Sequence, residues 1–212
     1  MYTVYDIETS GTSRDSEVYE FAAIRLSDDM KIIGTYNYFF YKKEWGDTQE
    51  AHIHGLTKEI LEPYAPDFYK NLAAMYAMMY DATVVGKNNL GFDNFVIKRF
   101  IDRNIKDLDE KATGIRKFKL GGSIDVQQYM AKHYRDYMSR IGTPVSSQSK
   151  GTLEQYMSVC GFTEADLVGF AKAIGIDVTS PRFKAHGAMY DVVMTYATFV
   201  WLINHNTMFK LI

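Results

Sequence analysis

Val4-Tyr5-Asp6-Ile7-Glu8-Thr9, residues 4–9, combines a β-strand pattern with two acidic side chains. Alternate residues of a strand point to the same face, so Asp6 and Glu8 are expected to present their carboxylates together, with the apolar side chains on the opposite face. A small-residue loop follows at residues 10–12, and its backbone can approach a ligand closely. Alone, an Asp-x-Glu triplet at a strand end favours an ordinary surface strand over a metal site.

Two further segments place acidic residues in apolar surroundings. Asp93 ends Asn88-Asn89-Leu90-Gly91-Phe92-Asp93, and Asp191 ends Ala185-His186-Gly187-Ala188-Met189-Tyr190-Asp191. Taken singly, Asp93 is better explained as a helix N-cap, and His186 as a core or surface side chain. Buried carboxylates are costly, and four that converge repel one another strongly. Divalent cations are the natural compensation, so the three segments together predict a metal-dependent enzyme.

The spacing of His186 and Asp191 restricts where each can lie. Five helical residues rotate two side chains about 140° apart, so both cannot face one point from a continuous helix. We therefore expect His186 in the loop before a helix and Asp191 in its first turns. A histidine beside an acid-rich metal site is suited to act as a general base on water.

Composition narrows the class of protein. The 212 residues are 47% hydrophobic and 24% charged, which fits one sizeable α/β domain. The single Cys160 excludes an intramolecular disulfide and is expected to be buried. Neither a leader nor a membrane span is recognised, so a cytoplasmic location is predicted. The net charge of −2 is not that of a strong nonspecific nucleic-acid binder. The clusters at 116–119 and 132–135 mix cations with aromatics, which suits either single strands or solvated surface charge.

The order of predicted elements indicates an α/β fold. Strands at 2–8, 17–26 and 31–41 form an antiparallel meander, and further strands are expected at 82–86 and 121–125. Helices are expected at the following ranges: 67–80, 92–104, from 126 to about 135, 152–160, 164–173 and 187–204. This order predicts a mixed five-stranded sheet flanked by helices. Phe95 is expected to face inward, and Asp125 to cap the helix that follows its strand.

These segments resemble the motifs of the DEDDh family, the DnaQ-like 3′→5′ exonucleases with a ribonuclease H-like fold. The likeness is greatest to the nuclease domain of exonuclease I, and it includes Phe21-Ala22-Ala23-Ile24-Arg25 and His54-Gly55-Leu56-Thr57. It implies one exonuclease domain over residues 1–212 that releases 5′-mononucleotides from the 3′ end of single-stranded DNA. Two Mg²⁺ ions, with Mn²⁺ as a substitute, are implied, held by the four acidic residues: Asp6, Glu8, Asp93 and Asp191. His186 is implied as the proton acceptor, and substrate contacts are expected from Thr9, Gly11, His54, Asn89 and Phe92.

Two departures from exonuclease I leave alternatives open. The chain stops where exonuclease I continues into domains that enclose the strand, which puts high processivity in question. Residues 161–185 are longer than expected and are predicted to form a helical insertion. The same fold also serves exoribonucleases and proofreading subunits, whose partner is a DNA polymerase or another replication or repair protein. A non-catalytic module that binds single-stranded nucleic acid is disfavoured, because such a protein is expected to have lost acidic ligands.

Overall fold

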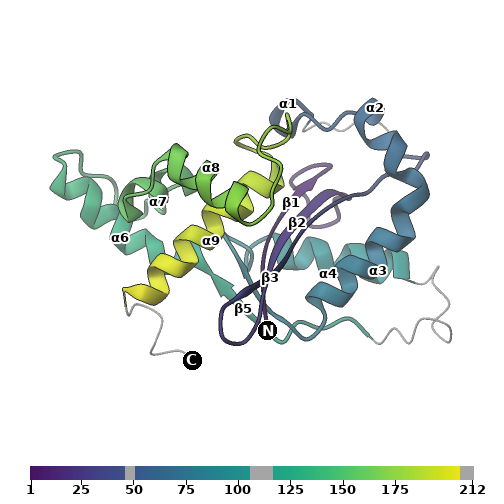
Figure 1. Ribbon diagram of the computed structural model, residues 1–212, viewed down its shortest axis with the longest axis horizontal. Helices are drawn as coiled ribbons and strands as arrows, with labels where there is room; N and C mark the ends of the chain where they lie inside the picture. Colours follow the sequence, from purple (N-terminus) through teal and green to yellow (C-terminus); the bar gives the residue numbers. More distant parts are fainter. Residues whose placement is uncertain (46–50, 106–116, 206–212) are drawn as a thin grey trace.

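The computed structural model describes residues 1–45, 51–105 and 117–205, which build one mixed sheet between two layers of helices (Figure 1). The strand order is β3-β2-β1-β4-β5. The strands are β1 Tyr2–Thr9, β2 Val18–Leu26, β3 Ile32–Phe39, β4 Thr83–Gly86 and β5 Gly122–Asp125. The first three pair antiparallel, and β4 and β5 run parallel to β1. The predicted fold class is confirmed.

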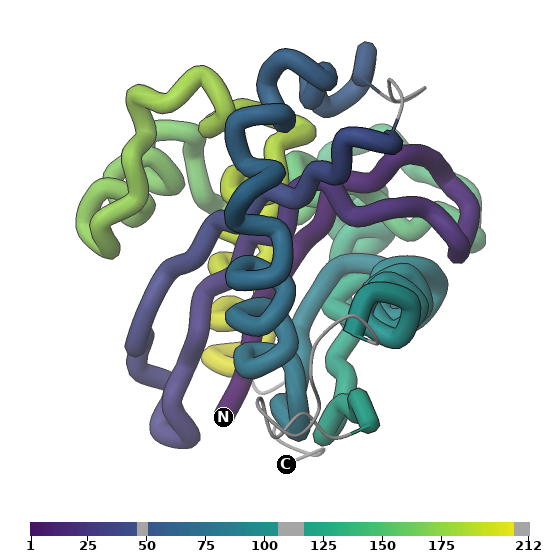
Figure 2. Tube along the Cα trace, turned by 90° about the vertical axis from the view of Figure 1, so that its right-hand side faces the viewer, coloured from purple at the N-terminus to yellow at the C-terminus, as the bar shows by residue number. Residues whose placement is uncertain are grey.

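The helices cover both faces of the sheet, as the turned view in Figure 2 also shows. They are α1 Ala51–His54, α2 Lys58–Leu61, η1 Glu62–Asp67, α3 Phe68–Met79, α4 Asp93–Asn104, α6 Val126–Arg140, α7 Leu153–Cys160, α8 Glu164–Ala173 and α9 Ala188–Asn204. Within the described residues, no helix combines the length and the apolar character needed to cross a membrane.

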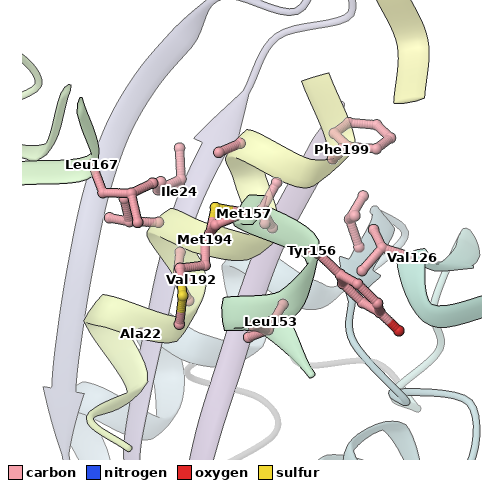
Figure 3. Packing of buried hydrophobic residues seen from close by; sticks show 14 of the residues in the cluster. Ala22, Ile24, Val126, Leu153, Tyr156, Met157, Leu167, Val192, Met194 and Phe199 are labelled. Carbon is pink, nitrogen blue, oxygen red and sulfur yellow. The ribbon is translucent and has the colours of Figure 1, made fainter. Parts of the chain in front are cut away.

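Alternation along β1 divides the core between the two faces. Val4 packs with α6, α7 and α9, while Tyr5 and Ile7 pack with α3 and α4. Figure 3 shows the first of these clusters, in which side chains of β2, α7, α8 and α9 interlock. Asp6 and Glu8 have the same parity as Val4, so they project toward α9, where the last acidic segment lies.

Several expectations need correction. The short segments α1, α2 and η1 were not predicted, because four to six residues are too few to show a helical period. Helix α6 continues to Arg140, beyond the predicted end near 135. Phe95 is 41% exposed and Ile97 is buried instead, since the inward stripe of α4 runs through Val96, Ile97, Phe100 and Ile101. The Phe95 ring lies 4.0 Å from the Arg14 guanidinium. Cys160 is half-buried, not fully buried.

Candidate active site

The acidic residues of the first and last motifs meet at one end of the sheet. Asp6 and Glu8 lie in the second half of β1, and Asp191 lies in the first turn of α9. One carboxylate oxygen from each can be chosen so that all three lie within 4.8 Å of one another. The backbone N–H of Asp191 donates to the Gly187 carbonyl at 3.2 Å, which fixes the start of the helix. The predicted convergence of β1 with α9 is therefore seen in the geometry.

Burial and mutual repulsion hold these carboxyl groups toward their protonated forms. Burial and then the Asp191 charge raise the pKa of Asp6 well above its usual value. Burial and the Glu20 charge raise the pKa of Glu8 to about 9. Burial and the Glu154 charge raise the pKa of Asp191 to about 7. The cluster is therefore short of positive charge.

The donor set fits a divalent cation. Asp191 Oδ1 is buried and has no hydrogen-bond partner among the described residues. Carboxylate oxygens are hard ligands, preferred by Mg²⁺ and Mn²⁺ over softer metals. A cation among Asp6, Glu8 and Asp191 would satisfy both the charge and the unpaired oxygen.

Asp93 lies beside this cluster but outside its closest group. It is the first residue of α4, and the N-cap position is occupied by Phe92, so the alternative of an N-cap role for Asp93 is wrong. Burial and the Asp125 charge raise its pKa to about 7. Its charge in turn contributes to the raised pKa values of Asp6 and Glu8. The structure thus brings three of the four acids together and places the fourth within electrostatic reach.

His186 occupies the turn before α9, as its spacing from Asp191 predicts. Its side chain is exposed, and its φ of 61° is in the left-handed region, which is unusual for histidine. Its backbone N–H lies near enough to the Asp191 carboxylate to oppose the rise in the pKa of that group. The next residue must be glycine here, since a Cβ at Gly187 would lie 2.3 Å from the Arg182 carbonyl oxygen.

A hollow of 350 Å³ opens beside the carboxylates. It is lined by Glu8, Thr9, Gly11, Thr12, Ile53, His54, Asn88 and Phe92. Four of the five predicted substrate contacts line it: Thr9, Gly11, His54 and Phe92. The fifth, Asn89, does not: it is fully buried, and its amide donates to the Ile124 carbonyl at 3.3 Å. Its neighbour Asn88 takes that place, a choice that two adjacent asparagines in the sequence do not reveal.

His54 forms a fixed wall of this hollow. Its Nε2 lies 3.2 Å from the Thr9 carbonyl oxygen, and its Nδ1 accepts from the Leu56 N–H at 3.0 Å. The ring therefore carries its proton on Nε2. Burial lowers the pKa of His54 to about 4, so the ring is neutral near pH 7. The buried imidazole holds the backbone of Thr9 in place.

Asp125 has the structural role that its sequence position predicts. Its Oδ1 caps α6 by accepting from the Gln127 N–H at 3.0 Å, and it also accepts from the Asn88 N–H at 2.8 Å. Burial raises its pKa, while these two hydrogen bonds and the nearby Lys150 and Lys87 oppose the rise. Asp125 thus anchors the segment that carries Asn88.

A second hollow, of 540 Å³, adjoins the first, and both include Asn88 in their walls. It is polar and is lined by Asn88, Leu90, Gly91, Asp125, Gln127, Gln128, Ala131, Arg135, Ser147, Gln148 and Lys150. From the two predicted clusters of cations and aromatics, Arg135 alone among the described residues lines this hollow. Phe118 and Tyr134 are buried and offer no stacking surface, and Arg116 lies outside the described residues.

One charged pair at the site was not predicted from the sequence. Glu20 in β2 is fully buried and forms an ion pair at 2.5 Å with Arg182, which lies in the coil before α9. Its other carboxylate oxygen accepts from the Asn37 amide at 3.0 Å. Neither residue stands in a recognisable motif, so the sequence held no signal for the pair.

Comparisons with known proteins agree with this architecture. No model of a protein family matches the chain. Over 107 residues, half of this chain, it is 33% identical to a curated relative, the PolC-type DNA polymerase III of Mycoplasmopsis pulmonis, and covers 7% of it. Escherichia coli exonuclease I in complex with a dA16 oligonucleotide matches 99% of this chain and 43% of its own, with 22% identity and a TM-score of 0.60.

Other exonuclease I structures match similarly. One has a TM-score of 0.65 at 21% identity and covers 99% of this chain and 43% of its own. The enzyme from Methylocaldum szegediense has a TM-score of 0.60 at 22% identity, covering 97% of this chain and 41% of its own. This chain thus spans less than half of the exonuclease I chains that it matches. The expected resemblance is confirmed as a shared α/β fold.

Proposed function

We propose that this chain is a metal-dependent 3′→5′ exonuclease that hydrolyses the terminal phosphodiester of single-stranded DNA and releases 5′-mononucleotides. The observation that carries the proposal is the meeting of Asp6, Glu8 and Asp191 beside a hollow lined by the loop after β1. The exonuclease I fold supports it, and several of those solved structures are complexes with single-stranded oligonucleotides.

The acidic residues would hold the metal, with Asp93 completing the set. Two Mg²⁺ or Mn²⁺ ions, when bound, would polarise the phosphodiester and lower the pKa of the attacking water. Asp6, Glu8 and Asp191 supply the compensating negative charge from half-buried positions. An imidazole nitrogen of His186, exposed on the turn that precedes the helix of Asp191, accepts the proton from water.

The first hollow would hold the terminal nucleotide. Backbone groups of Thr9 and Gly11 can contact the sugar and phosphate, with Thr9 held by His54. Phe92 offers an aromatic face for the base. Asn88 replaces Asn89 in this assignment because it lines the hollow.

We also propose that residues 1–212 act as one nuclease domain with residues 161–185 as a helical insertion. Helix α8, within that segment, packs on α9 through stacked Phe170 and Tyr196 rings with centroids 5.1 Å apart. The insertion thereby rests on the helix that carries Asp191.

The test is cleavage of labelled oligonucleotides. Single-stranded and duplex DNA and RNA, labelled at either end, are incubated with the protein and Mg²⁺, with EDTA as the control. We expect stepwise release of mononucleotides from the 3′ end of single-stranded DNA, abolished by EDTA. Absence of cleavage, or cleavage that survives EDTA, contradicts the proposal. Preferential digestion of the RNA would move the assignment to an exoribonuclease.

A polymerase-associated proofreading role is the second candidate. The similarity to a PolC-type DNA polymerase III over half of this chain favours it. Binding of the purified protein to a replicative polymerase, and faster removal of a mismatched than of a matched 3′ terminus, would support this role.

A further inference from the structure

Arg182 lies in the coil between α8 and α9, and its guanidinium contacts two other segments. Nη2 lies 2.5 Å from Glu20 Oε2 in β2, and Nη1 donates to the His54 carbonyl oxygen in α1. The side chains of Arg182 and Glu20 are 15% and 0% exposed. A guanidinium presents its donors in a rigid fork, so two fixed acceptors define its position closely. Figure 1 places α1 and the coil before α9 at the same end of the sheet.

Both contacts of Arg182 lead to the carboxylate cluster and its hollow. Glu20 is the residue opposite Glu8 in the β1–β2 pairing, and its charge, after burial, raises the pKa of Glu8. The Arg182 charge opposes that rise. The second partner of Arg182, His54, contacts the loop after β1: its Nε2 lies 3.2 Å from the Thr9 carbonyl oxygen. Arg182 thus contacts Glu20, which lies next to Glu8 of the carboxylate cluster, and His54, which lies next to Thr9 in the hollow.

The coil from Arg182 to His186 is short and tightly folded. The Lys184 N–H donates to the Arg182 carbonyl oxygen, and the Gly187 N–H to the Lys184 carbonyl oxygen, each at 3.0 Å. Gly187 packs so closely on the Arg182 carbonyl that a Cβ there would lie 2.3 Å from it. His186 sits within this coil in the left-handed conformation. His186 is only four residues after Arg182 in this hydrogen-bonded coil, so a displacement of Arg182 is expected to displace His186 as well.

We infer that Arg182 is a positioning residue: held by Glu20 and His54, it sets the place of the His186 imidazole relative to the carboxylate cluster. The catalytic consequence rests on the proposed function. Misplacement of a reacting group by about 1 Å can slow a reaction about 100-fold. A merely structural ion pair would instead affect stability, and activity would return once stability is restored.

The kinetic test removes the ion pair between Glu20 and Arg182 without leaving a buried charge. In the double variant Glu20→Gln/Arg182→Met both charges are gone, so no unpaired ion is left in the interior. With Mg²⁺ and the small substrate thymidine 5′-p-nitrophenyl phosphate, we expect kcat to fall about 100-fold with KM little changed. Arg182→Lys keeps the charge for Glu20 but lacks the fork, and should lie between the wild type and the double variant.

Arg99→Met is the matched control, because Arg99 pairs with Asp15 at the same 2.5 Å but is 50% exposed. It should retain wild-type kcat. If the folded double variant has the kcat of Arg99→Met, the inference is overturned.

A second measurement does not need activity. Histidine ring resonances are compared by NMR in metal-free wild-type protein and the double variant. We expect the His186 and His54 signals to move, while those of His133 on α6 and His205 at the far end of α9 stay in place. Unmoved His186 signals contradict the inference. A wild-type protein that releases no nucleotide would refute the proposed function, and this measurement would still decide the position of His186.

Discussion

Arg182 Nη2 lies 2.5 Å from Glu20 Oε2, although the two residues are 162 positions apart in the chain. Removing one partner of a buried ion pair leaves the other charge uncompensated, which costs about 3–5 kcal/mol. We expect Arg182→Met to lower the free energy of unfolding by about 3 kcal/mol. This is the lower end of that range, because the Arg182 side chain is 15% exposed and the pair is therefore partly solvated. Urea unfolding of metal-free protein measures this.

The double variant Glu20→Gln/Arg182→Met completes the cycle. It should recover most of the lost stability, because the amide introduced at position 20 can still pair with Asn37 and no buried charge remains. The exposed Arg99→Met should cost less than about 1 kcal/mol. If the double variant is no more stable than Arg182→Met, the uncompensated charge is not the source of the loss.

What the sequence could predict depends on the range of the interaction. The same-face pair Asp6 and Glu8 follows from strand alternation, and the turn position of His186 follows from helical spacing. The Glu20–Arg182 pair depends on how β2 and a coil 162 residues later meet, and no local period encodes this.

The choice between Asn88 and Asn89 also lay beyond the sequence. It depends on a left-handed φ of 58° at Asn88, which places that residue at the hollow while Asn89 faces β5.

The proton-accepting role of His186 is tested by His186→Asn. Asparagine tolerates the left-handed conformation at this position, so the turn is retained and only the base is removed. We expect kcat to fall about 10²–10⁴-fold, the usual contribution of a general base. Mg²⁺ affinity, measured by calorimetry, should change little because His186 is not among the acidic ligands. His133→Asn on α6 is the control, and activity equal to that control would exclude His186 as the base.

The raised carboxyl pKa values predict how pH and metal affect stability. The folded protein holds protons on Glu8 to about pH 9 and on Asp191 to about pH 7, above the ordinary values of 4.5 and 3.8. The folded state therefore binds more protons than the unfolded state in this window, and the metal-free protein loses stability as pH rises through it. We expect its Tm to fall between about pH 5 and pH 9.

Mg²⁺ should reverse this loss at the alkaline end. Metal binding needs deprotonated carboxylates, so about 10 mM Mg²⁺ should raise the Tm by several degrees near pH 8.5 and much less near pH 5. Asp6→Asn removes one charge and one ligand, and should weaken both the pH effect and the metal effect. A Mg²⁺ shift that is equal at both pH values, or unchanged in Asp6→Asn, would speak against a metal held by this cluster.

Asn88 and Asn89 should respond to substitution in opposite ways. Asn88→Gly keeps the left-handed turn and removes a side chain at both hollows, so we expect weaker substrate binding with little loss of stability. Asn89→Ala removes the buried amide that donates to Ile124, which should cost about 1–2 kcal/mol of stability. Unfolding curves together with KM for a short oligonucleotide separate the two. If Asn89→Ala raised KM with no change in stability, the assignment of the pocket residue would revert to Asn89.

Lys150 tests whether the second hollow receives the strand behind its terminal nucleotide. Lys150 and Arg135 both line that hollow, and their charges suit a phosphodiester backbone. Lys150→Glu should weaken binding of a strand of about 12 nucleotides roughly tenfold and reduce the dependence of log Kd on log salt by about one. Binding of thymidine 5′-monophosphate should stay unchanged, because the terminal nucleotide occupies the first hollow. Lys132→Glu is the matched control, since Lys132 lies on α6, pairs with Asp136 at 2.5 Å and does not line the hollow. Fluorescence anisotropy of the labelled strand, with Ca²⁺ as the divalent ion, measures binding by the wild type and the two lysine variants. An equal loss of strand affinity in both variants would indicate general charge attraction instead of a strand site.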